Sequence, residues 1–242
     1  MFNVGEISEA WARQSRLNTF YQGSVASTND WAKEKAFTPE VAAAPISLYL
    51  ADAQTQGRGR GHHSWSQALN GSALLSSWVY QLSLAPQPVV TCRIGLAVEK
   101  ALSATWPWLH WSLKAPNDIY LASGKMGGIL VENLQQGNSN CMIIGLGLNI
   151  FSHPEIPHAT DLLAHLHGER FVTTADWNIF LDRLFLELSS AVSLSGNLLS
   201  LTEQSSLLLA LNKKPDLTEK YTSVEADGTL ITAQRRIHWT EL

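Results

Sequence analysis

The fold is indicated most clearly by residues 119–150, where IYLASGKMGGILVE at 119–132 is followed by the apolar run CMIIGLGLNI at 141–150. Three apolar segments, 119–121, 125–132 and 141–150, are separated by short stretches rich in Gly, Asn and Ser, which favour turns. Short turns of this kind join antiparallel strands, whereas parallel strands need a longer crossover. The stretch therefore predicts an antiparallel meander of three strands.

Further elements are predicted on both sides of this meander. The pattern of apolar residues predicts strands at 46–51, 72–82 and 108–113, and a C-terminal hairpin at 221–233 that turns at Asp227-Gly228. Helical spacing predicts helices at 89–104, 174–194 and 198–211, a shorter one at 161–167, and one that starts near Ser27. Residues 39–45, between two prolines, are predicted to form a loop.

Composition describes a globular protein with a substantial core, since 45% of the 242 residues are hydrophobic and 16% are charged. The net charge of −4 argues against a nucleic-acid partner. No apolar run approaches the ~20 residues of a membrane span, and the N-terminus has no secretory core. Cys92 and Cys141 lack the spacing of a zinc site or a disulfide framework. We therefore expect a cytoplasmic protein.

A glycine–arginine stretch, Gly57-Arg58-Gly59-Arg60-Gly61, follows the first predicted strand. Glycine lets a backbone approach a ligand closely, and arginine presents a planar, permanently charged fork to carboxylate or phosphate. The loop has the chemistry to close over an anion, although a solvated surface turn is an equally good interpretation of these residues alone.

Four motifs follow one another along the chain: Ser27-Thr28-Asn29, Gln54 with Gly57-Arg58-Gly59-Arg60 and Trp65, Lys114-x-Pro116-Asn117-Asp118, and Gly124-Lys125-x-Gly127-Gly128-Ile129-Leu130-x-Glu132. Together, and in this order, they resemble the biotin protein ligase family. The later Gly145-x-Gly147-x-Asn149 is similar to the GxGxN strand of that family. The resemblance covers roughly residues 20–195.

The resemblance implies an α+β fold, with a mixed, mostly antiparallel sheet flanked by helices. It implies a ligase domain at residues 1–212 and, at 213–242, a truncated SH3-like β segment in which only the hairpin around 224–239 is expected. Fewer than thirty residues precede Ser27, so we expect the monofunctional type, which has no DNA-binding domain and no nucleic-acid partner.

The implied reaction uses biotin, ATP and Mg²⁺. Biotin and ATP form biotinyl-5′-AMP, and biotin then passes to a lysine of a biotin carboxyl carrier protein, such as that of acetyl-CoA carboxylase. Magnesium is expected to be carried by ATP near Asn117 and Asp118, without a metal site of the protein's own. The eight histidines show no HxxxH spacing, and only His165 and His167 are spaced as HxH, so a His-based metal site is not expected.

The resemblance also assigns residues to roles. The implied catalytic residues are Arg58, Arg60, Asp118 and Lys125. The implied biotin-binding residues are Ser27, Thr28, Asn29, Gln54, Gly57, Arg58, Gly59, Arg60, Lys125, Gly127 and Gly128. The implied ATP-binding residues are Arg58, Arg60, Trp65, Lys114, Asn117 and Asn149.

Several of these residues have a purely structural alternative. Ser27 and Thr28 suit the cap of a helix, because a hydroxyl there accepts from an orphan backbone amide. Trp65 suits the core of a chain with nine tryptophans. Asn117 and Asp118 suit an Asx turn, and Lys125 an exposed turn.

Two positions depart from the family's usual pattern. His63 stands where an arginine is usual, so a permanent charge becomes titratable near neutral pH. Ala115 stands where a tryptophan is usual in the KxPND motif. These departures predict a slower or leakier ligase than its relatives.

Two other functions stay open on the sequence. One is a lipoate or octanoate ligase of the same superfamily, and the other is a catalytically weak protein that binds biotin or its adenylate. The carrier protein, the turnover and the oligomeric state are also open, a homodimer included.

Overall fold

The structure, a computed structural model, describes residues 1–61, 63–166 and 171–242. The chain divides into two compact units. Unit 1 consists of residues 1–85 and 126–178, and unit 2 consists of residues 86–125 and 179–242. The expected boundary after residue 212 falls inside unit 2 and stays a prediction.

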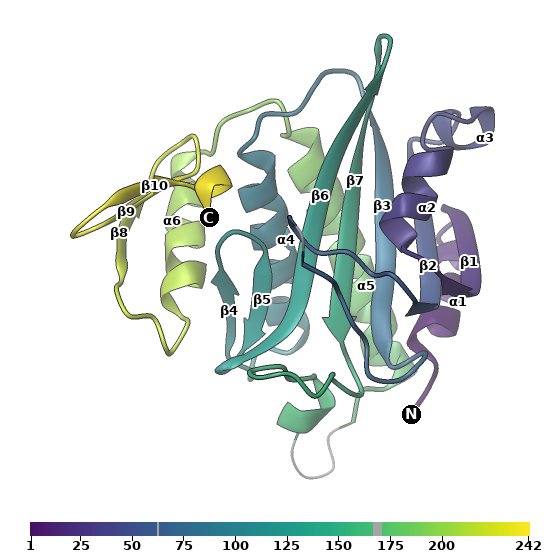
Figure 1. Ribbon diagram of the computed structural model, residues 1–242, viewed down its shortest axis with the longest axis horizontal. Coiled ribbons are helices and arrows are strands. Elements are labelled where there is room, and N and C mark those ends of the chain that lie inside the picture. Colours follow the sequence, from purple (N-terminus) through teal and green to yellow (C-terminus); the bar gives the residue numbers. More distant parts are fainter. Residues whose placement is uncertain (62, 167–170) are drawn as a thin grey trace. The chain divides into compact units, whose positions relative to one another are not determined.

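Unit 1 is built on five strands of a seven-stranded sheet, in the order β1-β2-β3-β7-β6 (Figure 1). Their bounds are Asn18–Val25 for β1, Ile46–Gln54 for β2, Ala73–Leu82 for β3, Ser139–Asn149 for β7 and Gly124–Gln136 for β6. β1 runs parallel to β2, and the pairs β2/β3, β3/β7 and β6/β7 are antiparallel. The expected mixed, mostly antiparallel sheet is confirmed.

The two faces of this sheet carry different helices. Ser77 and Trp78 are consecutive in β3, so their side chains point to opposite faces. Helix α1 (Val4–Gln14) packs on the Trp78 side, where the Trp11 and Trp78 rings lie 6.1 Å apart. Helix α2 (Thr28–Lys35) lies on the Ser77 side, because the Ser77 hydroxyl contacts Asn29. We call the Ser77 side the α2 face.

Part of the α2 face is filled by an apolar cluster. Its fully buried members come from α2, from the short helix α3 (Pro39–Ala42) and from the strands, and they are Ala32, Ala36, Val41, Tyr49, Val79, Cys141 and Ile143. Phe20 stacks on Tyr49 at a ring distance of 4.6 Å. This packing fixes α2 against β2, β3 and β7.

In unit 2, two helices pack against strands β4 (Trp111–Lys114) and β5 (Asp118–Leu121), which pair antiparallel, and a small sheet packs on one of these helices. The helices are α4 (Val90–Thr105) and α6 (Leu201–Asn212), and most of α5 (Thr174–Ser193) belongs to this unit. The buried Arg93 of α4 holds the start of α6, because its Nε donates to Glu203 at 2.5 Å.

The C-terminal appendage is a small antiparallel sheet of three strands in the order β10-β9-β8. They are β8 (Tyr221–Val224), β9 (Thr229–Thr232) and β10 (Arg236–His238), followed by a 3₁₀ turn at Trp239–Glu241. The expected reduced β appendage is confirmed, but the expectation of a hairpin alone was wrong by one strand.

Other differences from the sequence-based expectations are local. β1 was not expected, and the loop expected at 39–45 contains helix α3. Of the helix expected at 161–167, the structure has a single 3₁₀ turn, Leu163–His165, and His167 lies outside the described residues. Within the described part of the chain, no helix combines the length and apolar character of a membrane span.

Candidate functional site

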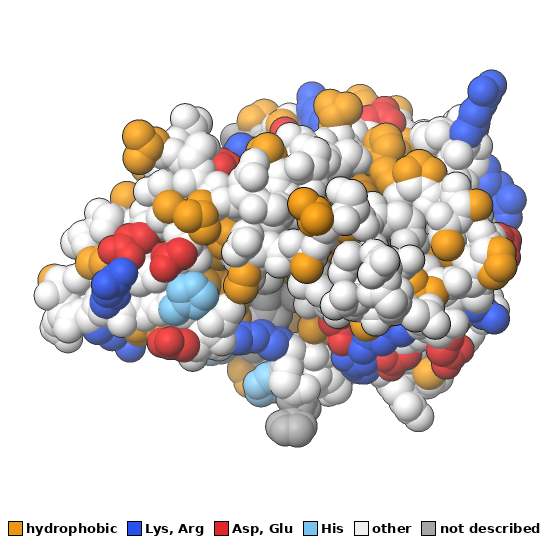
Figure 2. All heavy atoms as spheres, turned by 90° about the horizontal axis from the view of Figure 1, so that it is seen from above, with side chains coloured by type: hydrophobic (Ala, Val, Ile, Leu, Met, Phe, Trp, Pro, Cys, Tyr) orange, Lys and Arg blue, Asp and Glu red, His pale blue; other side chains and the backbone are white. Residues whose placement is uncertain are grey.

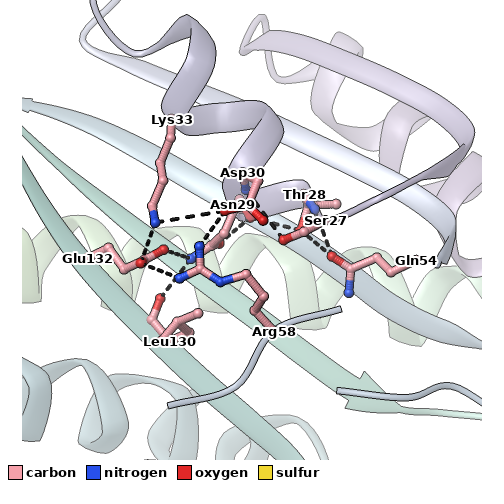
Figure 3. A network of polar contacts seen from close by, with 10 residues as sticks. Ser27, Thr28, Asn29, Asp30, Lys33, Gln54, Arg58, Leu130 and Glu132 are labelled. Atoms are coloured by element: carbon pink, nitrogen blue, oxygen red, sulfur yellow. Dashed lines mark hydrogen bonds and ion pairs between the residues drawn. The ribbon is translucent and has the colours of Figure 1, made fainter. Parts of the chain in front are cut away.

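The start of α2 is held by polar contacts that involve three of the expected biotin-binding residues (Figure 3). Ser27 is the N-cap of α2, and its hydroxyl accepts from the amide of Asp30 at 3.4 Å. Thr28 donates from its backbone amide to Gln54 Oε1 at 2.7 Å, and from its hydroxyl at 3.1 Å. Both Ser27 and Thr28 are buried. The capping alternative therefore holds for Ser27, and Thr28 and Gln54 lie together.

Asn29 reaches the sheet through a gap left by a glycine. A Cβ on Gly145 of β7 would lie 2.3 Å from Asn29 Oδ1, so only glycine leaves room for this side chain. Asn29 Oδ1 accepts from the Ser77 hydroxyl at 2.5 Å, and its amide donates to Glu132 Oε2 at 2.9 Å. Gly145 and Ser77 face each other in the β3/β7 register.

The Trp65 ring occupies a second gap, two residues further along β7. A Cβ on Gly147 would lie 2.5 Å from Trp65 Cε2. Because side chains alternate along a strand, Gly145, Gly147 and Asn149 all belong to the α2 face. The glycines of the GxGxN motif are therefore spaces for Asn29 and for the Trp65 ring.

Two buried polar atoms at this end of the face have no hydrogen-bond partner among the described residues. They are Nε1 of Trp65 and Oδ1 of Asn149, whose amide nitrogen donates to the Thr160 carbonyl at 3.1 Å. A buried polar atom left unpaired is costly, so these two atoms are candidates for ligand contacts. One is a donor and the other an acceptor.

The guanidinium of Arg58 is partly exposed and lies between two carboxylates (Figure 3). Its Nη1 pairs with Asp30 of α2, and its Nη2 donates to Glu132 Oε1 of β6 at 2.6 Å. Lys33 Nζ lies 2.6 Å from the same Glu132 oxygen. We call Asp30, Lys33, Arg58 and Glu132 the Arg58 cluster.

The Arg58 cluster stabilises its own charged forms. Burial raises the pKa of the Glu132 carboxyl, but hydrogen bonds from Lys33, Asn29 and Arg58 outweigh this effect and hold the pKa below its usual value. For Arg58, burial lowers the pKa of the guanidinium, but its bonds to Glu132 and Asp30 raise that pKa by more. The net shift of the Arg58 pKa is therefore upward. Both groups stay charged near neutral pH.

The glycine–arginine loop forms a short hairpin over the described residues 57–61 and 63–65. The Trp65 amide donates to the Gly57 carbonyl at 2.8 Å, and the Gly59 amide donates to the His63 carbonyl at 2.8 Å. Arg58 and Ser64 face each other as an isolated antiparallel bridge. Gly61 has φ +64°, a left-handed conformation that favours glycine. His62 lies outside the described residues.

Four further predicted residues, Lys114, Asn117, Asp118 and Lys125, belong to unit 2, whereas Arg60, Gly127 and Gly128 belong to unit 1. Lys125 Nζ pairs with Asp118 Oδ1 at 2.6 Å, and Asn117 lies in the turn between β4 and β5, after the cis peptide Ala115–Pro116. Lys114 Nζ lies 6.0 Å from the centroid of the Tyr120 ring, and Lys214 Nζ lies 4.8 Å from it. Lys214 had no expected role.

The structure thus brings the expected residues together in two groups. Unit 1 holds the group around α2, the hairpin and β7, and unit 2 holds Lys125 with Asp118. Sequence reasoning gave no role to Lys33, Ser77 or Glu132. A signal existed for two of them: Glu132 alternates with Gly128 and Leu130 along one strand face, and Lys33 follows Asp30 by three residues in a helix.

On the side of the molecule drawn in Figure 2, Lys and Arg side chains are interspersed with Asp and Glu, and they form no broad basic surface there. Among the described residues, no group of three or more His, Cys, Asp or Glu is arranged to hold a metal ion.

Comparison with known proteins identifies the family. The sequence model of the Biotin/lipoate A/B protein ligase family matches residues 22–149, more than half of the chain. The chain belongs to this family.

The named relatives are biotin ligases. Over 151 residues the chain is 32% identical to the biotin--[acetyl-CoA-carboxylase] ligase of Mycobacterium tuberculosis, a match that covers 60% of this chain and 53% of the relative. It is 33% identical over 132 residues to the bifunctional ligase/repressor BirA of Bacillus spizizenii, covering 54% of this chain and 39% of that one. The chain thus spans about half or less of these curated relatives.

The fold is shared with solved structures. The biotin protein ligase of Aquifex aeolicus in complex with biotin and ATP superposes with a TM-score of 0.65, covering 93% of this chain and 97% of that one. At 23% identity, this likeness concerns the fold.

Proposed function

We propose that this chain is an ATP-dependent ligase that forms biotinyl-5′-AMP and transfers biotin to a lysine of a biotin carboxyl carrier protein, such as that of acetyl-CoA carboxylase. Family membership supports a ligase. The name of the mycobacterial relative supports this carrier, and the Aquifex aeolicus complex supports biotin and ATP as substrates.

One observation carries the proposal. The two buried atoms without a hydrogen-bond partner in the described part of the chain, Trp65 Nε1 and Asn149 Oδ1, both belong to the α2 face of β7, beside its glycines. Adenine offers both an amino donor and ring-nitrogen acceptors, so it can satisfy a donor and an acceptor at once. We assign these two residues to the adenine of ATP.

Biotin is assigned to the neighbouring part of the α2 face. Gly128 pairs with Gly147 in the β6/β7 register, so the backbone of β6 is bare beside the Trp65 ring, where a second ring can lie. Gly127 precedes it in β6. The ureido ring of biotin is neutral and polar, so it needs partners when buried, and Ser27, Thr28 and Gln54 offer them.

The chemistry requires two anions to meet. A carboxylate oxygen of biotin attacks the α-phosphorus of ATP, the bond to the β-phosphate oxygen breaks, and pyrophosphate leaves. We propose that Arg60 and Lys125 stabilise the charge on the α-phosphate, since oriented cations contribute most where charge develops. Lys114 and Asn117 are assigned to the other phosphates.

In the second step the amine of the carrier lysine attacks the acyl carbon, AMP leaves, and a proton is lost. Asp118 is proposed to accept that proton. Its ion pair with Lys125 at 2.6 Å orients the carboxylate. For these residues of unit 2, the proposal rests on the motif and on this pair.

Magnesium fits as a companion of ATP. Mg²⁺ keeps several waters and binds through one or two carboxylates together with substrate phosphates. Asp118 is one such carboxylate, and with Asn117 it would hold the ion and help neutralise phosphate charge.

The experiment is a transfer assay. The purified chain is incubated with ATP, Mg²⁺, an apo-carrier domain, and either radiolabelled biotin or radiolabelled lipoate. Label on the carrier from biotin alone supports the proposal. Label from lipoate alone identifies a lipoate ligase, and bound biotin without transfer identifies a binding protein; either result refutes it.

A further inference from the structure

The first arginine of the loop is bound by the protein itself. Both terminal nitrogens of Arg58 are bound to carboxylates, one from α2 and one from β6. The two arms of the guanidinium fork suit this bridge, because each arm meets a different carboxylate. Arg58 thereby joins three segments that are far apart in the sequence.

The charges of the Arg58 cluster balance. Arg58 and Lys33 contribute two positive charges, and Asp30 and Glu132 contribute two negative charges. A phosphate or carboxylate brought to Arg58 would meet Glu132, which lies 2.6 Å from Nη2, and the like charges would repel. The cluster is therefore poorly suited to bind the reacting anions.

The same contacts bear on the hairpin that carries Trp65. Arg58 lies opposite Ser64, one residue before Trp65, and the Trp65 amide donates to the carbonyl of Gly57 at 2.8 Å. Fixing Arg58 therefore fixes both strands of the hairpin, and with them the place of the Trp65 ring over Gly147.

We infer that Arg58 and Glu132 are positioning residues, which hold the Gly57–Trp65 hairpin to β6 and α2, and that the anion contact of this loop belongs to Arg60. The inference rests on the proposed function for the identity of the anions. Its structural part, the anchoring of the hairpin, is independent of any activity.

The first test is a double-mutant cycle read by hydrogen exchange in the ligand-free protein. Arg58→Ala and Glu132→Gln should each speed the exchange of the hydrogen-bonded Gly59 and Trp65 amides by about tenfold, and the double variant should be no faster than the faster single variant. The anchoring role would be refuted by a wild-type exchange rate in either single variant. It would also be refuted if the double variant exchanged faster than either single variant, by the product of their separate effects.

A conservative variant separates charge from bridging. Arg58→Lys keeps the positive charge but loses the fork that reaches two carboxylates. Exchange in Arg58→Lys should be nearly as fast as in Arg58→Ala. Wild-type exchange in Arg58→Lys would show that charge alone suffices and would overturn the bridging role. This variant also serves if Arg58→Ala does not fold.

The second test uses the kinetics of biotin-dependent exchange of pyrophosphate into ATP. Arg58→Ala and Glu132→Gln should raise KM for ATP by a similar factor, about tenfold, with a smaller change in kcat and no further rise in the double variant. Arg60→Ala should instead lower kcat. A loss of kcat in Arg58→Ala that Glu132→Gln does not share would place Arg58 on the reacting groups.

The matched control is Arg13→Ala, which removes another Arg–Glu ion pair of unit 1. In that pair, Arg13 Nη2 lies 2.7 Å from Glu9 Oε1 of α1. It should leave amide exchange and kinetics at wild-type values. If the wild-type protein has no biotin-dependent exchange activity, the proposed function fails, while the hydrogen-exchange cycle still decides whether Arg58 and Glu132 anchor the hairpin.

Discussion

Gly147→Ala should weaken nucleotide binding while leaving the stability of the fold nearly unchanged. The new Cβ would lie 2.5 Å from Trp65 Cε2 and 2.7 Å from Cζ2. Carbon atoms in contact lie about 3.5–4.0 Å apart, so the ring must move by about 1 Å or more. The shift takes the buried Trp65 Nε1 away from the proposed adenine contact, and a buried donor left unpaired costs about 1–3 kcal/mol. Because Trp65 is on a loop hairpin, it can move without disturbing the sheet.

The expected result is an increase in KM for ATP of about 5- to 150-fold, the factor that this energy corresponds to, with a loss of unfolding free energy below about 1 kcal/mol. The assay is biotin-dependent exchange of labelled pyrophosphate into ATP, with urea unfolding beside it. Gly23→Ala is the matched control, since no atom lies within 4 Å of a Cβ there.

A double variant completes this test. If the substitution acts through the Trp65 ring, adding Gly147→Ala to Trp65→Ala should raise KM for ATP no further. A KM for ATP within about twofold of wild type in Gly147→Ala, or additive effects in the double variant, would refute the assignment of this face to the nucleotide.

Three further predictions follow from other contacts. Gly145→Ala should displace Asn29, whose Oδ1 would lie 2.3 Å from the new Cβ, and weaken biotin binding in calorimetry, whereas wild-type affinity would contradict the role of this gap. Lys125→Ala should abolish biotinyl-5′-AMP formation while thermal stability stays near wild type, and retained formation would remove Lys125 from the reaction. Burial would raise the pKa of Glu203, but hydrogen bonds from Arg93 and Ser200 lower it to about 2. The ionised carboxylate therefore stabilises the fold at pH values above about 4.5, its pKa in the unfolded chain, and this stabilisation is lost as the pH falls from about 4.5 to 2. Urea unfolding should therefore lose roughly 2–3 kcal/mol more from pH 5 to pH 2 in wild type than in Glu203→Gln, and equal losses would contradict it.

Elements with a strong local pattern were predictable from the sequence. The strands β6 and β7 are apolar runs between turn residues, and α5 has apolar residues at helical spacing over twenty residues. β1 was missed because its sequence, NTFYQGSV, does not alternate, and because it is held by parallel pairing with β2, which is specified elsewhere in the chain. Its partner lies 29 residues away, as in Asn18↔Ser47.

The site was predictable as a set of residues but not as a set of contacts. The motifs marked Arg58, yet its partners come from Asp30, 28 positions earlier, and from Glu132, 74 positions later. A sequence gives the charge of a side chain, and only the fold decides which opposite charges meet it. The glycines of the GxGxN motif show the same limit, since their function depends on Asn29 and Trp65.

All the catalytic and substrate-binding roles proposed for these residues depend on the activation of biotin with ATP by this chain. The most direct measurement is chromatography of the products after the purified chain is incubated with ATP, Mg²⁺ and labelled biotin, with labelled lipoate in a parallel reaction. We expect biotinyl-5′-AMP and pyrophosphate in equal amounts, and no lipoyl adenylate. Formation of lipoyl adenylate alone, or no adenylate from either acid, would contradict the proposal.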